Sequence, residues 1–143
     1  MLLAAEVISV GLPFCVFKVL TGLVVLGAGG ALLAPVGVAL VALGGIDALV
    51  NLVNLGALLG TRRRALGVCL TDVVLGRALG HEVALALDVL LSFVLVAVVI
   101  GGKLLLRLPP GWGLPLWNLA VILNVLGAGI GQLLTAMRRE ARS

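Results

Sequence analysis

The chain has 143 residues, of which 62% are hydrophobic and 11% are charged, and its formal net charge is +4. A soluble domain of this size needs about a quarter charged residues to face water, so a mean hydropathy of +1.32 excludes a free-standing soluble fold. We therefore expect an all-α integral membrane protein in which residues 1–143 form one transmembrane helical domain.

The first half of the chain predicts two membrane spans. Residues 1–12 are apolar but too few to cross a bilayer, and a proline follows them, so we expect a short interfacial lead-in. The next stretch is too long for one span, and Ala34–Gly37 supplies the proline and glycine of a turn. This places helices at 14–34 and 36–59, with a break at Gly44–Gly45 as the alternative.

The second half predicts an interfacial helix and two further spans. Residues 61–82 carry apolar and polar positions at helical spacing, which is typical of an amphipathic helix lying in the membrane interface. Spans are expected at 83–106 and 115–137, separated by a loop rich in proline and glycine. Trp112 and Trp117 suit the headgroup region and are predicted to be interface anchors.

Basic residues predict the orientation. Two groups flank the apolar stretches on the same side: Arg62, Arg63 and Arg64, then Arg138 and Arg139. The positive-inside rule places these arginines, and with them both chain ends, in the cytoplasm, at lipid headgroups of what we expect to be a bacterial inner membrane. No aromatic residues alternate with the arginines as a base-stacking surface requires, so no nucleic-acid partner is expected.

Polar residues inside the spans are the candidates for chemistry, because lipid does not solvate them. They are Lys18, Asp47, Asn51, Asn54, Asp88 and Asn124. The rise per residue along the expected helices places Lys18 and Asp88 at similar depths in the membrane, so we expect them to form a pair. It places Asp47 near the bilayer centre, where we expect no cation beside it. The set fits either hydrogen bonds between packed helices or a relay that binds a proton or cation at Asp47.

Other features support packing more than catalysis. Three glycine pairs have the small-xxx-small spacing that lets helices approach closely: Gly56/Gly60, Gly76/Gly80 and Gly127/Gly131. His81 is the only histidine and lacks further ligands, while Cys15 and Cys69 have no neighbouring base and fit small packing residues. We expect no metal, no cofactor and no enzymatic activity.

Two functions remain open from the sequence. The first is a small accessory or structural subunit that packs against a larger membrane complex or against itself, with lipid and a membrane-protein partner as its surroundings. The alternative is a small proton- or cation-coupled transporter or channel that acts as a homo-oligomer.

Overall fold

The computed structural model describes residues 4–5, 7–28, 30–61, 63, 65–67 and 69–140, and few side chains beyond residue 127. Every regular element in this part of the chain is helical, and five are α-helices. The elements are η1 (Val7–Gly11, a π-helix), α2 (Leu12–Ala28), α3 (Ala34–Thr61), α4 (Leu70–Leu79), α5 (His81–Gly101), η2 (Leu104–Arg107, a 3₁₀ turn) and α6 (Gly113–Glu140).

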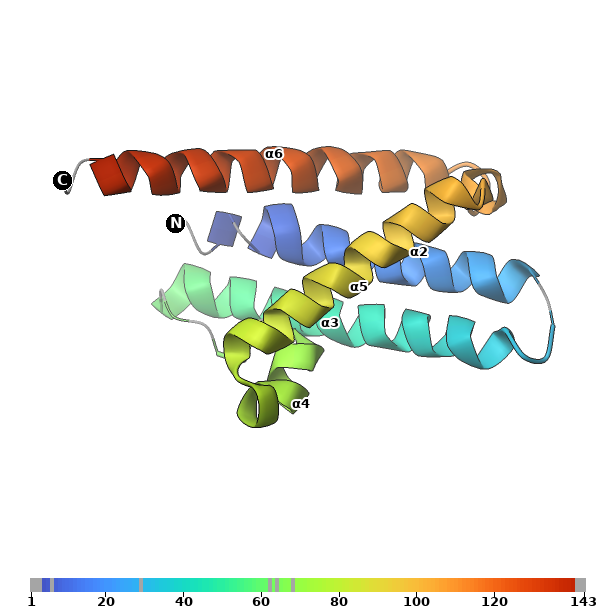
Figure 1. Cartoon of the computed structure of the whole chain (residues 1–143), viewed down its shortest axis with the longest axis horizontal. Coiled ribbons are helices and arrows are strands. Elements are labelled where there is room, and N and C mark those ends of the chain that lie inside the picture. The colour runs from blue at the N-terminus through green and yellow to red at the C-terminus, as the bar shows by residue number, and fades with distance from the viewer. Residues whose placement is uncertain are drawn as a thin grey trace.

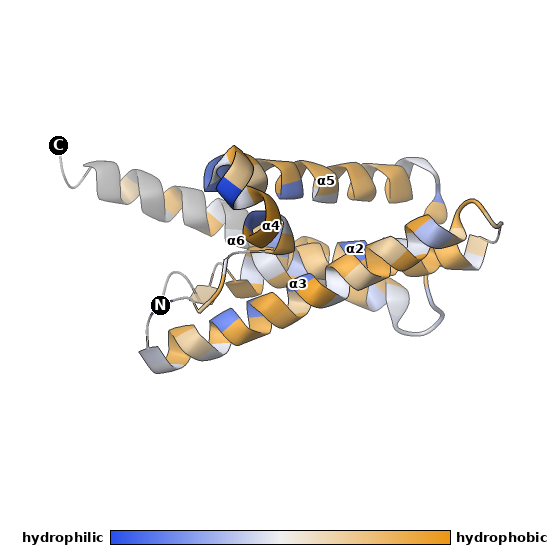
Figure 2. Ribbon diagram, turned by 90° about the horizontal axis from the view of Figure 1, so that it is seen from below, coloured by the Kyte–Doolittle hydropathy of each residue, from blue (hydrophilic) through white to orange (hydrophobic). Residues whose placement is uncertain are grey.

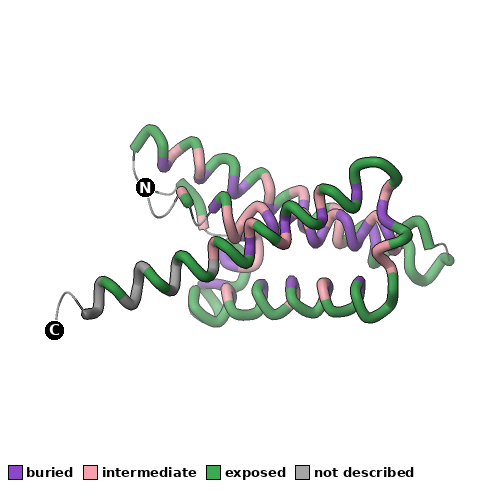
Figure 3. Tube along the Cα trace, turned by 90° about the horizontal axis from the view of Figure 1, so that it is seen from above, coloured by how far each residue is buried: buried purple, intermediate pink, exposed green. Residues whose placement is uncertain are grey.

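Helix α2 is the centre of the bundle. It packs along α3 on one side and along α6 on the other, and α5 crosses it obliquely (Figure 1). Successive long helices run in opposite directions, and the short α4 lies beside the end of α3 and the start of α5. Buried positions follow α2, while α5 buries the one line of residues that faces the bundle (Figure 3).

Three helical stretches are long and apolar enough to cross a membrane: Val7–Ala28, Ala34–Thr61 and His81–Gly101. A shorter apolar stretch, Gly113–Gly127, forms the first half of α6. Hydrophobic residues dominate α2, α3 and α5 (Figure 2), and many large ones on α3 and α5 are exposed, a pattern that indicates lipid as their surroundings. The chain thus has the fold of a multi-pass membrane protein.

The first span begins and ends earlier than expected. Residues 7–11, predicted to be part of a separate lead-in, continue into α2 through a π-helical turn, so that Pro13 follows a change of hydrogen-bond register instead of a break. The helix then ends at Ala28, because Gly30 adopts a φ of 108° that is open mainly to glycine. The predicted turn at Ala34–Gly37 is the first turn of α3.

The alternative break at Gly44–Gly45 is wrong, because α3 is continuous through both residues. Gly44 instead lets α2 approach: a Cβ there would lie 2.9 Å from the carbonyl oxygen of Cys15. Gly22 and Gly37 make the same close contact near the turn, where a Cβ on Gly22 would lie 2.7 Å from the Gly37 carbonyl oxygen. None of the three predicted glycine pairs forms this interface.

The interfacial segment is less helical than predicted. Among the described residues of the expected 61–82, only Leu70–Leu79 form an α-helix separate from its neighbours, because α3 extends to Thr61 and α5 begins at His81. The third span also ends at Gly101 and not at 106, since Gly102 and a left-handed Lys103 (φ 56°) turn the chain. The fourth helix covers its expected range of 115–137 and extends it at both ends.

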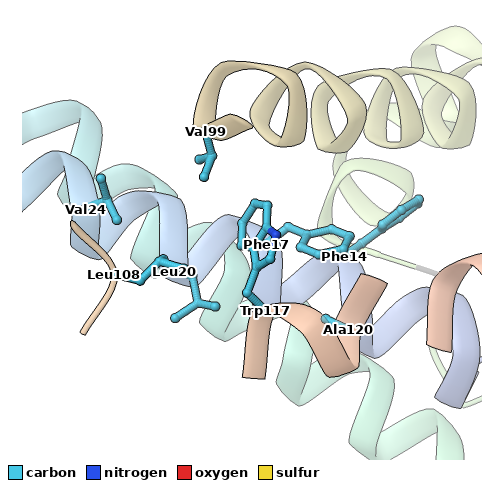
Figure 4. Packing of buried hydrophobic residues seen from close by; sticks show 8 residues of the cluster. All are labelled: Phe14, Phe17, Leu20, Val24, Val99, Leu108, Trp117 and Ala120. Atoms are coloured by element: carbon cyan, nitrogen blue, oxygen red, sulfur yellow. The ribbon is translucent and has the colours of Figure 1, made fainter. Parts of the chain in front are cut away.

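An apolar core fills the half of the bundle nearer the α5–α6 connection. Phe17 packs against Trp117, with ring centroids 5.0 Å apart, and Leu20, Val24 and Val99 complete the layer (Figure 4). Trp117, predicted as a surface anchor, is therefore a core residue that is 2% exposed. Trp112 is half exposed, as an interface residue would be.

Candidate functional site

Helix α2 also contributes a lysine to a buried ion cluster. The ammonium group of Lys18 donates to Oδ2 of Asp47 on α3 and to Oδ1 of Asp88 on α5, each at 2.5 Å. Lys18 and Asp47 are each 1% exposed and Asp88 is 6% exposed. One lysine side chain therefore joins three of the long helices.

The predicted contact between Lys18 and Asp88 is present, whereas the prediction that Asp47 lacks a cation is wrong. The error follows from the misplaced first span. With the helix beginning at Val7, Lys18 lies at the middle of a 22-residue stretch instead of near its end. Asp47 lies at the middle of the 28-residue α3, so the two side chains share one depth.

The chain segment that contains α4 adds one hydrogen bond to each carboxylate. The backbone N–H of Leu70 donates to Oδ1 of Asp47 at 2.6 Å, and the hydroxyl of Thr71 donates to Oδ1 of Asp88 at 3.1 Å. The roles of Leu70 and Thr71 were not predictable from the sequence, because a backbone donor and a hydroxyl far away in the chain leave no spacing signal. Within the described part of the chain, Oδ2 of Asp88 has no hydrogen-bond donor.

The charges in the cluster do not balance. Of the described lysine, arginine and histidine side chains, only that of Lys18 lies within 4 Å of either carboxylate. Two carboxylates thus share one ammonium group. An unpaired charge is costly to bury in a medium of low dielectric constant.

A cavity of about 140 Å³ lies against the cluster. Its polar lining comes from the three charged residues and Asn51, and its apolar lining includes Phe14 and Leu85. Since a water molecule needs roughly 10–15 Å³ of such space, the cavity has room for several waters or for one small hydrated ion. The π-helical η1 contributes Val7, Val10 and Gly11 to the wall.

Asn51 and Asn54 bind the chain's own backbone. Asn51 donates to the carbonyl oxygen of Asp47, one turn earlier in α3, at 2.9 Å, and more weakly to the sulfur of Cys15. Asn54 lies outside the cavity lining and holds the connection after α3, accepting from the N–H groups of Ala65 and Leu66 and donating to the carbonyl oxygen of Gly67. Both residues thus stabilise the segments around the cluster.

The remaining predicted residues that the structure describes lie apart from the cluster. Asn124 on α6 is buried, and its Nδ2 has no acceptor among the described residues. Arg62 and Arg64 lie outside the described residues, and Arg63 is exposed beyond the end of α3. Arg138 and Arg139 belong to α6, near the end of the bundle where α3 is followed by α4, but their side chains are not among those described.

Both cysteines are buried, reduced and part of the cavity wall. Cys69 also accepts from the N–H of Asp72 at the start of α4, and burial raises the pKa of its thiol to about 11. At neutral pH this thiol is protonated and unreactive. Asp72, in the first turn of α4, also contacts His81 of α5, with a separation of 2.5 Å between Oδ1 and Nδ1.

The cluster, in sum, is a buried set of ionisable groups that contacts a small cavity at the depth of the helix centres. No group of three or more metal-binding side chains occurs among the described residues. Comparison of the chain with protein families, with curated proteins and with solved structures finds no match.

Proposed function

We propose that this protein is a small proton- or cation-coupled membrane transporter or channel that acts as a homo-oligomer. The observation that carries the proposal is the number of charges in the ion cluster: two carboxylates, of Asp47 and Asp88, share the single ammonium group of Lys18 beside a cavity. In a one-to-one ion pair the two charges cancel, whereas this cluster has one carboxylate more than its ammonium group balances. The second buried carboxylate is the group that takes up a proton or a small cation reversibly.

The proposed membrane arrangement has four spans. α6 is the fourth: its 28 residues extend about 42 Å at 1.5 Å per residue, and it runs antiparallel to α2, on which it packs. The connection after α3 and the end of α6 then lie on one side, together with the arginines at 62–64 and 138–139. The positive-inside rule makes that side the cytoplasm, in a bacterial inner membrane.

The test is ion flux in proteoliposomes, with proton, sodium and potassium gradients applied in turn. Asp47→Asn removes a charge from the cluster but retains an oxygen that accepts from Leu70. We expect flux to fall at least about tenfold, since an interaction with a charged group is worth roughly 1.5–3 kcal/mol, while the elution profile in detergent stays unchanged.

Glu82→Gln is the matched control, because it neutralises an exposed carboxylate at the start of α5. It should leave flux at the wild-type level. Wild-type flux in Asp47→Asn would reject the cluster as the ion site. Absence of flux above that of empty liposomes for every ion would reject the transport function.

The outer face of α3 supports a second candidate, the accessory subunit. Gly45, Gly56 and Gly60 have open space where a Cβ would lie, and neighbouring Leu49, Leu52 and Val53 are exposed. Small residues on an exposed helix let another helix approach closely. The same face would bind copies of this chain in the transporter and a larger membrane complex in the accessory subunit.

Native mass spectrometry after mild-detergent purification from native membranes distinguishes a homo-oligomer from a complex with a larger protein. A homo-oligomer is the result expected for the transporter. A stoichiometric complex with a larger membrane protein would favour the accessory subunit.

A further inference from the structure

Helix α4 is attached to the ion cluster by its first two residues. The N–H of Leu70 binds Asp47, and the hydroxyl of Thr71 binds Asp88. These are the two carboxylates that also hold Lys18. The same two carboxylates therefore hold the start of α4 and bind the charged group in the cluster.

The start of α4 also closes one side of the cavity. Cys69, the residue before the helix, lines the cavity and is 5% exposed. The helix has 10 residues and so extends only about 15 Å, which is too short to cross a bilayer. It is a cover at one end of the site instead of a membrane span.

The start of α4 has attachments to α3, to α5 and to the cluster. Before the helix, Asn54 holds residues 65–67 against α3 without touching the cavity. In the first turn, Asp72 contacts His81 at the start of α5. After the helix, Gly80 has a φ of 87°, a conformation that glycine adopts easily, and it separates α4 from α5. Of these attachments, those of Leu70 and Thr71 are made to the charged groups.

We infer that α4 is the gate of the cavity on the side of the α3–α4 connection, held closed by Asp47 and Asp88 while these bind Lys18. The inference rests on the proposed transport function and gives its site a means of regulation. A proton or cation taken up by either carboxylate weakens that group as an acceptor, which releases the start of α4 and exposes the cavity.

The alkylation rate of Cys69 measures the opening of this gate. Cys15→Ser leaves Cys69 as the single cysteine in the chain, and N-ethylmaleimide in proteoliposomes at one fixed pH is the probe. In this parent the buried, protonated thiol should react slowly. Thr71→Val removes the hydroxyl that holds Asp88 and should raise the rate about tenfold, the effect of losing a hydrogen bond to a charged group.

Two further variants make the test specific. Thr71→Ser retains a hydroxyl and should restore the slow rate. Thr61→Val removes a hydroxyl that bonds to the Ala57 carbonyl within α3 and should leave the rate at the parent's value. Asp47→Leu should accelerate alkylation as Thr71→Val does, by removing the acceptor for Leu70.

Flux measured on the same proteoliposomes separates this inference from the function on which it rests. Parent-like alkylation in both Thr71→Val and Asp47→Leu, with normal flux, would overturn the gate and leave transport standing. Faster alkylation in these variants, in a chain that conducts no ion, would support α4 as a cover held by the cluster and reject transport.

Discussion

On one side of α2, Gly22 and Gly37 bring two helix backbones together, whereas Lys18 joins α2 to α5 through the carboxylate of Asp88. The glycine contact is fixed in its geometry, because atoms of the facing helix backbone occupy the space that a side chain would fill. In the proposed function, the ionic contact changes with the proton or cation that the carboxylates hold. On that proposal, α2 and α3 form a fixed unit, while the attachment of α5 and α4 changes.

The largest effect is expected from Lys18→Met, which leaves Asp47 and Asp88 buried without their cation. Removing one partner of a buried ionic contact destabilises a protein by about 3–5 kcal/mol. We expect a large drop in the melting temperature of the detergent-solubilised protein.

Restoring the charge balance tests the cause of that drop. Adding Asp47→Asn and Asp88→Asn to Lys18→Met should recover most of the stability, since no unpaired charge is left. A triple variant no more stable than the single one would contradict the unpaired carboxylate charges as the cause of the drop.

A smaller loss is expected when the fixed side of α2 is overpacked. Gly44→Ala places a methyl group 2.8–2.9 Å from atoms of Val19, Cys15 and Lys18, and forcing atoms into a packed interface costs about 1–3 kcal/mol. Its neighbour Gly45 has open space, so Gly45→Ala should be neutral or slightly stabilising. Equal melting temperatures for the two variants would contradict the close contact between α2 and α3.

The smallest effect, with the opposite sign, is expected at Thr21 in α2. Its hydroxyl is buried and has no partner among the described residues. Thr21→Val keeps the shape and removes the unpaired group, which should raise stability by up to about 1 kcal/mol. A lower melting temperature would show that the hydroxyl has a partner.

Parts of the ion cluster were predictable from sequence spacing alone. Asp47, Asn51 and Asn54 follow one another at four and three residues, which places them on one face of a helix, and all three are buried. The Lys18–Asp88 contact followed from similar depths. The contact between Lys18 and Asp47 did not, because it required the first helix to begin at Val7, and a π-helical turn before Pro13 has no clear sequence pattern.

The sequence by itself determined that the chain is a helical membrane protein, because lipid solvates apolar side chains but no backbone polar groups and so requires long apolar helices. Proline and glycine also determined roughly where these helices are separated. Only the tertiary structure decided which glycines meet, that Trp117 is buried, and that Leu70 and Thr71 bind the cluster. These contacts depend on how helices far apart in the chain are rotated and crossed, which the spacing along one helix does not encode.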